Sequence, residues 1–214
     1  MAFWNRKKKA PAAPVSPSVA GVIPCAGASS RMGMSKALMD AGGRSFLAAT
    51  VGSLVAGGCE PVVVVLATGQ DHEERKAKDA GALPLLNPDP GEGPITSLRV
   101  ALAALQGTVE AVAFLPVDHP QVLPETVARL REALLSSDAP LALPVYEGRR
   151  GHPALFRRAL FPELTDPALQ GGARTVVHAH LDAALLVEVD DPGVVTDIDT
   201  PEAYQAAFPP RSTT

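Results

Sequence analysis

Short apolar runs alternate with longer amphipathic segments along most of the chain. Six runs, rich in β-branched residues and of strand length, cover residues 19–23, 61–66, 83–86, 111–115, 139–145 and 184–189. Between them, apolar residues recur at helical spacing over residues 95–105 and 123–134. Near-continuously apolar strands that alternate with helices form parallel sheets covered on both faces. The pattern therefore predicts a three-layer α/β/α sandwich with a mostly parallel, Rossmann-like sheet.

Two further segments carry the signals of a helix start. Ser45 is a predicted N-cap, because it precedes an apolar stripe over residues 47–55. Thr200, Pro201 and Glu202 combine an N-cap residue, a proline in the first turn and an acid near the positive end of the helix dipole. This combination predicts a closing helix of about two turns.

The two ends of the chain lack this periodicity. Residues 1–18 contain a basic run and then a Pro/Ala/Ser-rich stretch that can bury little apolar surface, which predicts a flexible tail. We interpret the basic run as solvated, with a docking patch as the alternative. Residues 209–214 are predicted to be flexible as well. One domain over residues 19–208 remains, a length that supports a sizeable core.

Composition and charge narrow the classes of partner. The apolar fraction of 46% and the charged fraction of 20% are typical of a globular protein. A net charge of −4 gives no overall attraction for nucleic acid or an anionic membrane, so small-molecule substrates are expected. Cys25 and Cys59 form no metal-binding or disulfide pattern. Without a secretory signal or a membrane-length apolar run, the expected localisation is cytoplasmic.

The segment directly after the first predicted strand carries the strongest candidate chemistry. Residues 24–36 read PCAGASSRMGMSK, and small residues at this position let backbone N–H groups approach an anion closely. Arg31 and Lys36 add a planar fork and a point charge, which suit the spread oxygens of a triphosphate. The glycine spacing fits neither a P-loop nor a dinucleotide fingerprint. The segment therefore predicts a phosphate-binding loop of another kind.

Acidic residues follow two later segments. Asp118 emerges from the end of an apolar strand, and Mg²⁺ is typically held by one or two carboxylates plus substrate phosphates. A turn-forming aspartate is the alternative. Of Asp197 and Asp199, we expect at most one to face the metal. The alternative for Asp199 is that it serves as a structural cap. His119 is interpreted as a neighbour of the metal site, since hard Mg²⁺ prefers oxygen ligands.

Two weaker signals remain open. The turn-rich loop over residues 87–97 opens a helix, and Asn87 or Ser97 could contact a base or sugar there, or simply cap the helix. His178 and His180 lie two residues apart on a predicted helix and do not share a face. We therefore interpret them as solvated surface residues and not as a metal-binding pair.

The quoted motifs resemble those of a known family. The string CAGASSRMGMSK resembles the signature loop of the MobA-like NTP transferases. Its spacing to PVDHP, YEGRRGHPALF, LQGGARTVV and DIDTPEAY is similar in particular to the molybdenum cofactor cytidylyltransferase branch, over residues 19 to 208. The resemblance implies a nucleotidyltransferase-type sandwich that transfers CMP from CTP to molybdopterin with Mg²⁺ and releases pyrophosphate.

The resemblance also implies roles for individual residues. Arg31, Lys36 and Asp118 would be catalytic, with Asp118 as a metal ligand and Asp197 or Asp199 as a weaker second ligand. The expected nucleotide-binding residues, including the two from the turn-rich loop, are Cys25, Ala26, Gly27, Ala28, Arg31, Lys36, Asn87 and Ser97. The expected acceptor-binding residues are Gly151, His152 and Pro153. Ala26 favours cytidine, because the guanylyl branch usually has glycine at this position.

Two other functions stay open at this point. The same chemistry could use GTP or another NTP with a different phosphorylated acceptor. The chain could also be a non-catalytic nucleotide-binding module that delivers cofactor to a molybdoenzyme partner. Because an acceptor phosphate is already ionised near neutral pH, an in-line attack on the α-phosphorus needs positioning and charge neutralisation but no dedicated general base.

Overall fold

The computed structural model describes residues 18–27, 35–105, 107 and 109–209. Nearly all of both predicted tails lies outside these residues, so the predicted domain limits stay a prediction. Ala28 and Arg31, which the sequence assigns to the nucleotide site, also lie outside the described residues.

Eight strands of the described chain form one sheet in the order β3-β2-β1-β4-β7-β5-β6, with β8 pairing with β5. The strands are β1 (Val19–Pro24), β2 (Val62–Leu66), β3 (Leu83–Leu86), β4 (Ala111–Phe114), β5 (Leu141–Tyr146), β6 (Arg149–Arg150), β7 (Ala154–Arg157) and β8 (Leu185–Glu188). Pairs β1–β2, β1–β4, β2–β3 and β5–β8 are parallel, whereas β7 runs antiparallel to β4 and β5. All six predicted strands form, which confirms the predicted fold class.

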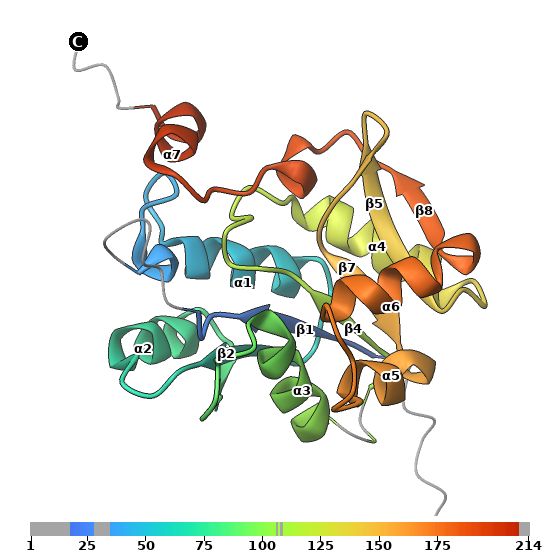
Figure 1. The fold of residues 1–214 in the computed structure, drawn as a ribbon. Helices are drawn as coiled ribbons and strands as arrows, with labels where there is room; N and C mark the ends of the chain where they lie inside the picture. The colour runs from blue at the N-terminus through green and yellow to red at the C-terminus, as the bar shows by residue number, and fades with distance from the viewer. Residues whose placement is uncertain (1–17, 28–34, 106, 108, 210–214) are drawn as a thin grey trace, which may run out of the picture.

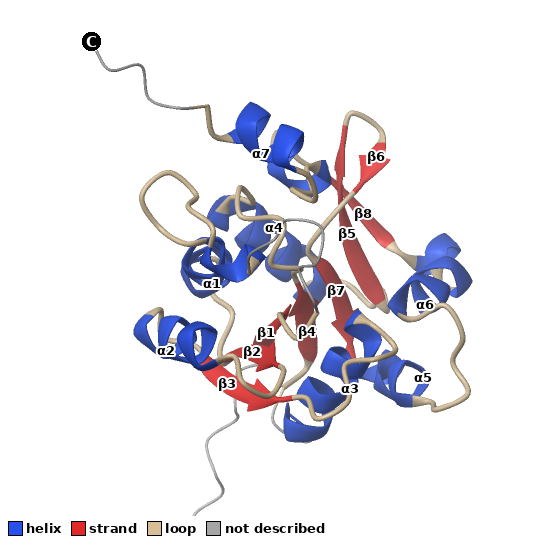
Figure 2. Ribbon diagram, turned by 60° about the vertical axis from the view of Figure 1, so that its left-hand side comes forward, coloured by secondary structure: helices blue, strands red, loops and turns tan. Residues whose placement is uncertain are grey.

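Helices cover both faces of this sheet (Figures 1 and 2). They are α1 (Phe46–Ala56), α2 (Asp71–Asp79), α3 (Pro94–Leu105), α4 (Pro124–Leu135), α5 (Phe161–Thr165), α6 (Ala173–Ala179) and α7 (Pro201–Ala207). Side chains of β1 alternate between two cores: Val19 and Ile23 pack with α1, α2 and α4, whereas Ala20 and Val22 pack with α3, α5 and α6. Among the described residues, no helix is long and apolar enough to cross a membrane.

Both predicted helix starts are confirmed. The Ser45 hydroxyl accepts a hydrogen bond from the Ala48 N–H at 3.2 Å, and the Thr200 hydroxyl accepts one from the Ala203 N–H at 3.2 Å. Helix α7 packs Tyr204 against Phe46 at the start of α1, with ring centroids 6.1 Å apart. The chain just before α7 is thereby held next to the loops at the carboxyl end of β1 and β4.

The β5–β6–β7 hairpin was not predicted from the sequence. Glu147 and Gly148 have φ angles of 48° and 73°, which suit a two-residue type I′ turn between β5 and β6. After β6 the chain passes through Gly151 and inserts β7 between β4 and β5. This antiparallel insertion makes the sheet mixed and moves the 151–153 segment next to the end of β4.

Candidate functional site

Loops at the carboxyl end of the sheet enclose a small cavity of about 190 Å³. Its described lining residues follow β1, β3 and β4 or belong to the short helix η1 (Lys36–Leu38), and they are Pro24, Cys25, Ala26, Gly27, Ser35, Lys36, Ala37, Pro90, Gly93, Pro94, Ser97, Pro116, Val117 and Asp118. This is the edge of a parallel sheet where ligands bind in doubly wound folds. The structure therefore gathers most of the predicted nucleotide-binding residues around one space.

The loop after β1 is fixed through its backbone. The Cys25 N–H donates to the Val65 carbonyl at 2.8 Å, and the Gln70 amide donates to the Cys25 carbonyl at 3.1 Å. A Cβ on Gly27 would meet no atom of the described residues within 4 Å, so the space beside it is open to a ligand as far as the described chain goes. Burial, reinforced by the charge of Glu73, raises the pKa of the Cys25 thiol to about 12. The thiol therefore stays protonated near neutral pH and does not act as a nucleophile.

Lys36 and Asp118 line this cavity, and Asp199, which is absent from the described lining, contacts Lys36. The Lys36 ammonium contacts the Asp199 carboxylate directly and lies 3.7 Å from Oδ2 of Asp118. The two acids come from distant parts of the chain, and the backbone joins them: the Ile198 N–H donates to the Asp118 carbonyl at 2.9 Å. Ile198 is fully buried, which anchors the segment that carries Asp199. Two carboxylates and one cation are thus held together by the scaffold.

The environment of Asp118 fits a cation ligand. Burial raises the pKa of the Asp118 carboxyl, and Asp199 raises it further, while His119 and Lys36 lower it. Oδ1 of Asp118 is buried and has no hydrogen-bond partner among the described atoms. In the described chain, no group of three or more His, Cys, Asp or Glu residues could hold a metal ion. A cation at Asp118 and Asp199 would therefore take its remaining ligands from substrate or water.

Asp197 occupies a different position from Asp199. Residues two apart on an extended segment share a face, so strand periodicity does not separate them. The structure separates them by environment: Asp199 contacts Lys36 and is half-buried, whereas Asp197 is exposed. The negative charge of Asp197 acts on His152, where it opposes the lowering of the pKa. Of Asp197 and Asp199, the two candidates for a second metal ligand, Asp199 is the one that shares with Asp118 a contact to Lys36.

Asn87 and Ser97 have different surroundings. Ser97 lines the small cavity, and Asn87 is absent from the described lining residues. The Asn87 amide donates to the hydroxyls of Thr96 at 2.8 Å and Ser97 at 3.2 Å, and its oxygen accepts from the Asp89 N–H at 3.1 Å. Asn87 therefore braces the loop that opens α3. Its amide is engaged within the protein, and a role for Asn87 in nucleotide binding stays a prediction.

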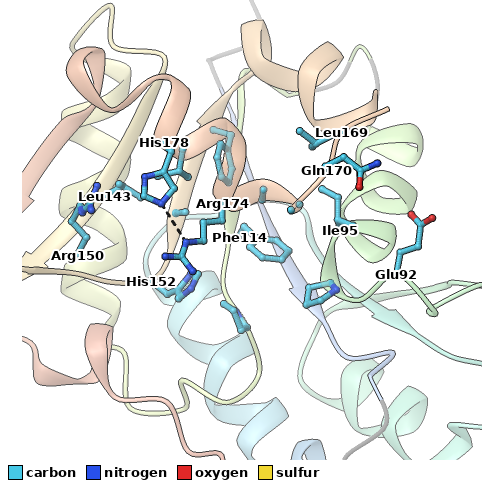
Figure 3. A pocket seen from close by; sticks show the side chains of 18 of the residues that line it. Glu92, Ile95, Phe114, Leu143, Arg150, His152, Leu169, Gln170, Arg174 and His178 are labelled. Carbon is cyan, nitrogen blue, oxygen red and sulfur yellow. Dashed lines mark hydrogen bonds between the residues drawn. The ribbon is translucent and has the colours of Figure 1, made fainter. Parts of the chain in front are cut away.

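A second, larger cavity of about 810 Å³ adjoins the first (Figure 3). Pro94 and Pro116 line both cavities, so the two spaces meet at these prolines. Its apolar lining includes Ile95, Phe114, Leu143, Ala154, Phe156, Leu169 and Val177. Its polar lining includes Glu92, Arg150, His152, Gln170, Arg174 and His178. The cavity is therefore suited to an amphipathic ligand that carries negative charge.

The predicted acceptor segment lies on this cavity. Gly151 and His152 are lining residues, and Pro153 is absent from the described lining. A Cβ on Gly151 would lie 2.1 Å from the Val194 carbonyl oxygen, so only glycine allows the helix η4 (Pro192–Val195) to approach this closely. The His152 N–H donates to the same carbonyl at 2.8 Å. Gly151 thus places His152 and has a packing role.

His152 is held as a neutral imidazole. Burial, together with the neighbouring His119, lowers the pKa of His152 to about 4. The two imidazole rings have centroids 4.9 Å apart, and Nδ1 of His152 is buried without a hydrogen-bond partner in the described chain. The His119 ring lies within hydrogen-bond distance of the Gly193 carbonyl, at 3.2 Å. A ring held this way lines the cavity without adding charge near neutral pH.

Sequence reasoning missed the contribution of α6 to this cavity. Arg174 was not assigned, although it lies in the quoted LQGGARTVV string, and His178 was interpreted as a surface residue. Both line the large cavity, and Nε of Arg174 donates to Nε2 of His178 at 3.2 Å (Figure 3). His180 pairs instead with Glu163 at 2.9 Å. The two histidines therefore have separate partners, and only His178 faces the cavity.

The site and fold agree with a known family. The sequence model of the MobA-like NTP transferase domain matches residues 21–184, so the chain belongs to the MobA-like NTP transferase family, a class of nucleotidyltransferases. The family resemblance inferred from the sequence is confirmed.

Three similar proteins are compared with this chain. A probable molybdenum cofactor guanylyltransferase of Mycolicibacterium paratuberculosis is 30% identical over 172 residues, which cover 79% of this chain and 83% of that protein. Nicotine blue oxidoreductase of Paenarthrobacter nicotinovorans is 29% identical over 198 residues, covering 87% and 94%. The crystal structure of Rv0371c from Mycobacterium tuberculosis H37Rv superposes with a TM-score of 0.77 at 26% identity, covering 90% and 98%. These relatives do not single out the cytidylyl branch.

Proposed function

We propose that this protein transfers CMP from CTP to molybdopterin and releases pyrophosphate. The observation that carries the proposal is the pair of adjoining cavities. The small one, at the carboxyl edge of the parallel strands, is lined by Lys36 and Asp118, with Asp199 in contact with Lys36, and the large one presents an apolar floor with cationic side chains. A nucleotide in the first and an amphipathic phosphorylated acceptor in the second would meet at Pro94 and Pro116.

The roles of the residues follow from their positions. Lys36 would neutralise charge on the triphosphate, and the buried backbone of the loop after β1 would bring N–H groups close to phosphate oxygens. Asp118 and Asp199 are the described carboxylates suited to hold Mg²⁺, which when bound supplies charge neutralisation at the α-phosphate and the leaving pyrophosphate. The acceptor phosphate attacks the α-phosphorus, and the bond to the pyrophosphate oxygen breaks.

The choice of nucleotide base rests on Ala26. This residue is 5% exposed and lines the small cavity. The family resemblance associates alanine at this position with CTP. A second candidate is GMP transfer from GTP, because the relative from Mycolicibacterium paratuberculosis is named as a probable guanylyltransferase. Both candidates share the same reaction and the same acceptor.

The first experiment is to measure pyrophosphate release from CTP, GTP, ATP and UTP in turn, with Mg²⁺ and molybdopterin, and to detect the dinucleotide product. We expect release with CTP, its loss in Asp118→Ala, and its retention in the matched control Asp79→Ala on the exposed surface of α2. Preference for GTP would replace the first candidate by the second. Absence of release with all four nucleotides would refute nucleotidyl transfer to molybdopterin. This outcome is worth testing because one relative is named as an oxidoreductase.

A further inference from the structure

Charge is unevenly distributed around the large cavity. In the view of Figure 3, four nitrogen-bearing side chains lie on one side of the cavity, and they are Arg150, His152, Arg174 and His178. Glu92 and Gln170 lie on the other side. Apolar side chains such as Ile95 and Phe114 line the cavity between these two sides. A ligand with an anionic group at one end and a neutral ring system at the other would match this arrangement.

Arg174 has the geometry of an anion-binding residue. It is exposed to the cavity from α6, and its Nε donates to Nε2 of His178, one helical turn further along, at 3.2 Å. This hydrogen bond uses Nε and fixes the plane of the guanidinium, while the two Nη groups keep the fork that matches phosphate oxygens. Because His178 accepts from Arg174, its imidazole must be unprotonated at Nε2. His178 therefore acts as a positioning residue for Arg174.

The side of the large cavity that carries Arg150 and Arg174, here called the cationic side, borders the loop of Asp118. His152 belongs to that side, its ring packs against His119 with centroids 4.9 Å apart, and His119 directly follows Asp118. Pro116, which lines both cavities, lies two residues before Asp118. An anionic group held beside His152 would consequently lie close to the loop of Asp118, which lines the small cavity.

Two anions have to approach each other in the proposed reaction, and Coulomb repulsion opposes their meeting. Lys36 supplies positive charge on the nucleotide side, and the acceptor side needs a cation of its own. We infer that Arg174, positioned by His178, binds the terminal phosphate of the acceptor in the large cavity. The inference rests on the proposed function for the identity of the acceptor, and it adds a phosphate-binding residue that the sequence motifs did not assign.

The test measures binding and does not depend on turnover. The probe is the oxidised, fluorescent form of molybdopterin, titrated with and without its terminal phosphate in the absence of NTP. We expect the wild-type protein to bind the phosphorylated form roughly 10- to 100-fold more tightly, the range of one charge-assisted hydrogen-bonded contact. Arg174→Ala should abolish this preference, and Arg174→Lys should keep only part of it, because lysine retains the charge without the fork.

A matched control exists on α2. Arg75 also donates to a histidine of its own helix, His72, at 2.8 Å, and it is exposed and outside both cavities. Arg75→Ala should therefore keep the full phosphate preference. For the positioning role, His178→Leu should weaken binding of the phosphorylated form, and His178→Gln should restore it, because the glutamine carbonyl can accept from Arg174.

The outcomes separate the inference from the proposed function. Retention of the phosphate preference in Arg174→Ala, or absence of any preference in the wild-type protein, would overturn the inference. A preference that is lost in Arg174→Ala but kept in Arg75→Ala would support it. If that result came with no pyrophosphate release from any NTP, the proposed function would fail while the assignment of Arg174 as a phosphate-binding residue would stand.

Discussion

The two cavities are built from different kinds of chain connection. The small cavity uses the ends of parallel strands and the loops that lead into their helices, and its lining residue Lys36 pairs with both Asp118 and Asp199. The large cavity uses the antiparallel hairpin, η4 and the short helix α6, and its wall carries arginines beside a neutral His152. The first arrangement suits charge neutralisation during a reaction. The second suits recognition of an acceptor.

The largest expected effect comes from the small cavity. Lys36→Ala removes the cation that contacts both carboxylates, and we expect the kcat of pyrophosphate release to fall about 100-fold or more, by comparison with the loss of a single transition-state donor. Binding of the acceptor should change little, because Lys36 does not line the large cavity. Steady-state kinetics with each substrate varied in turn measure both effects.

Lys76→Ala provides the control for charge. Lys76 is exposed on α2 and lines neither cavity, so its removal should leave kcat within about twofold of the wild type, as for most surface substitutions. Unchanged turnover in a folded Lys36→Ala protein would contradict the division of roles between the two cavities.

The small cavity was largely predictable from the sequence. In a parallel sheet, residues that directly follow strands converge at one edge, so Gly27, Lys36, Ser97 and Asp118 could be placed together from strand periodicity alone. Asp199 is the exception, because its position depends on the buried Ile198 and on packing of α7 against α1. Such long-range packing leaves no periodic signal in the sequence.

The large cavity was not predictable in the same way. Strand β7 enters the sheet antiparallel between β4 and β5, and its 151–153 segment had been assigned from family motifs without a structural position. Arg174 and His178 lie on a helix of seven residues, too short for a clear amphipathic pattern. Which face of α6 turns towards the cavity depends on its packing against α5, which sequence spacing does not encode.

A substitution at Gly151 tests whether this hairpin maintains the large cavity. Gly151→Ala would place a Cβ 2.1 Å from the Val194 carbonyl oxygen, so η4 has to shift. We expect the free energy of unfolding to fall by about 3 kcal/mol, the upper end of the range for overpacking. The KM for the acceptor should rise while the KM for the nucleotide stays near its wild-type value. Urea unfolding and steady-state kinetics provide these measurements.

Gly52→Ala is the matched control within α1. Among the described residues, a Cβ at this position would meet Nη1 of Arg44 alone, at 3.5 Å, an ordinary contact. Alanine also has the higher helix propensity, so this variant should gain about 0.5–1 kcal/mol of stability. Equal stability changes in the two variants would show that close packing at Gly151 does not support the large cavity.

The smallest expected effect concerns the neutral state of His152 and appears only in acid. Burial lowers the pKa of His152 to about 4 in the folded protein, from an ordinary value of 6.5. Because the folded-state pKa is depressed, the stabilisation is fully present above pH 6.5 and is lost as the pH falls towards 4. This group alone should remove about 2 kcal/mol of the free energy of unfolding between pH 7.5 and pH 5.

His152→Gln should show a shallower pH dependence by that amount in urea unfolding, whereas the exposed His72→Gln should match the wild type. Equal slopes for the wild type and His152→Gln would mean that His152 is not held neutral, and the large cavity would then carry one more positive charge in acid than its geometry indicates.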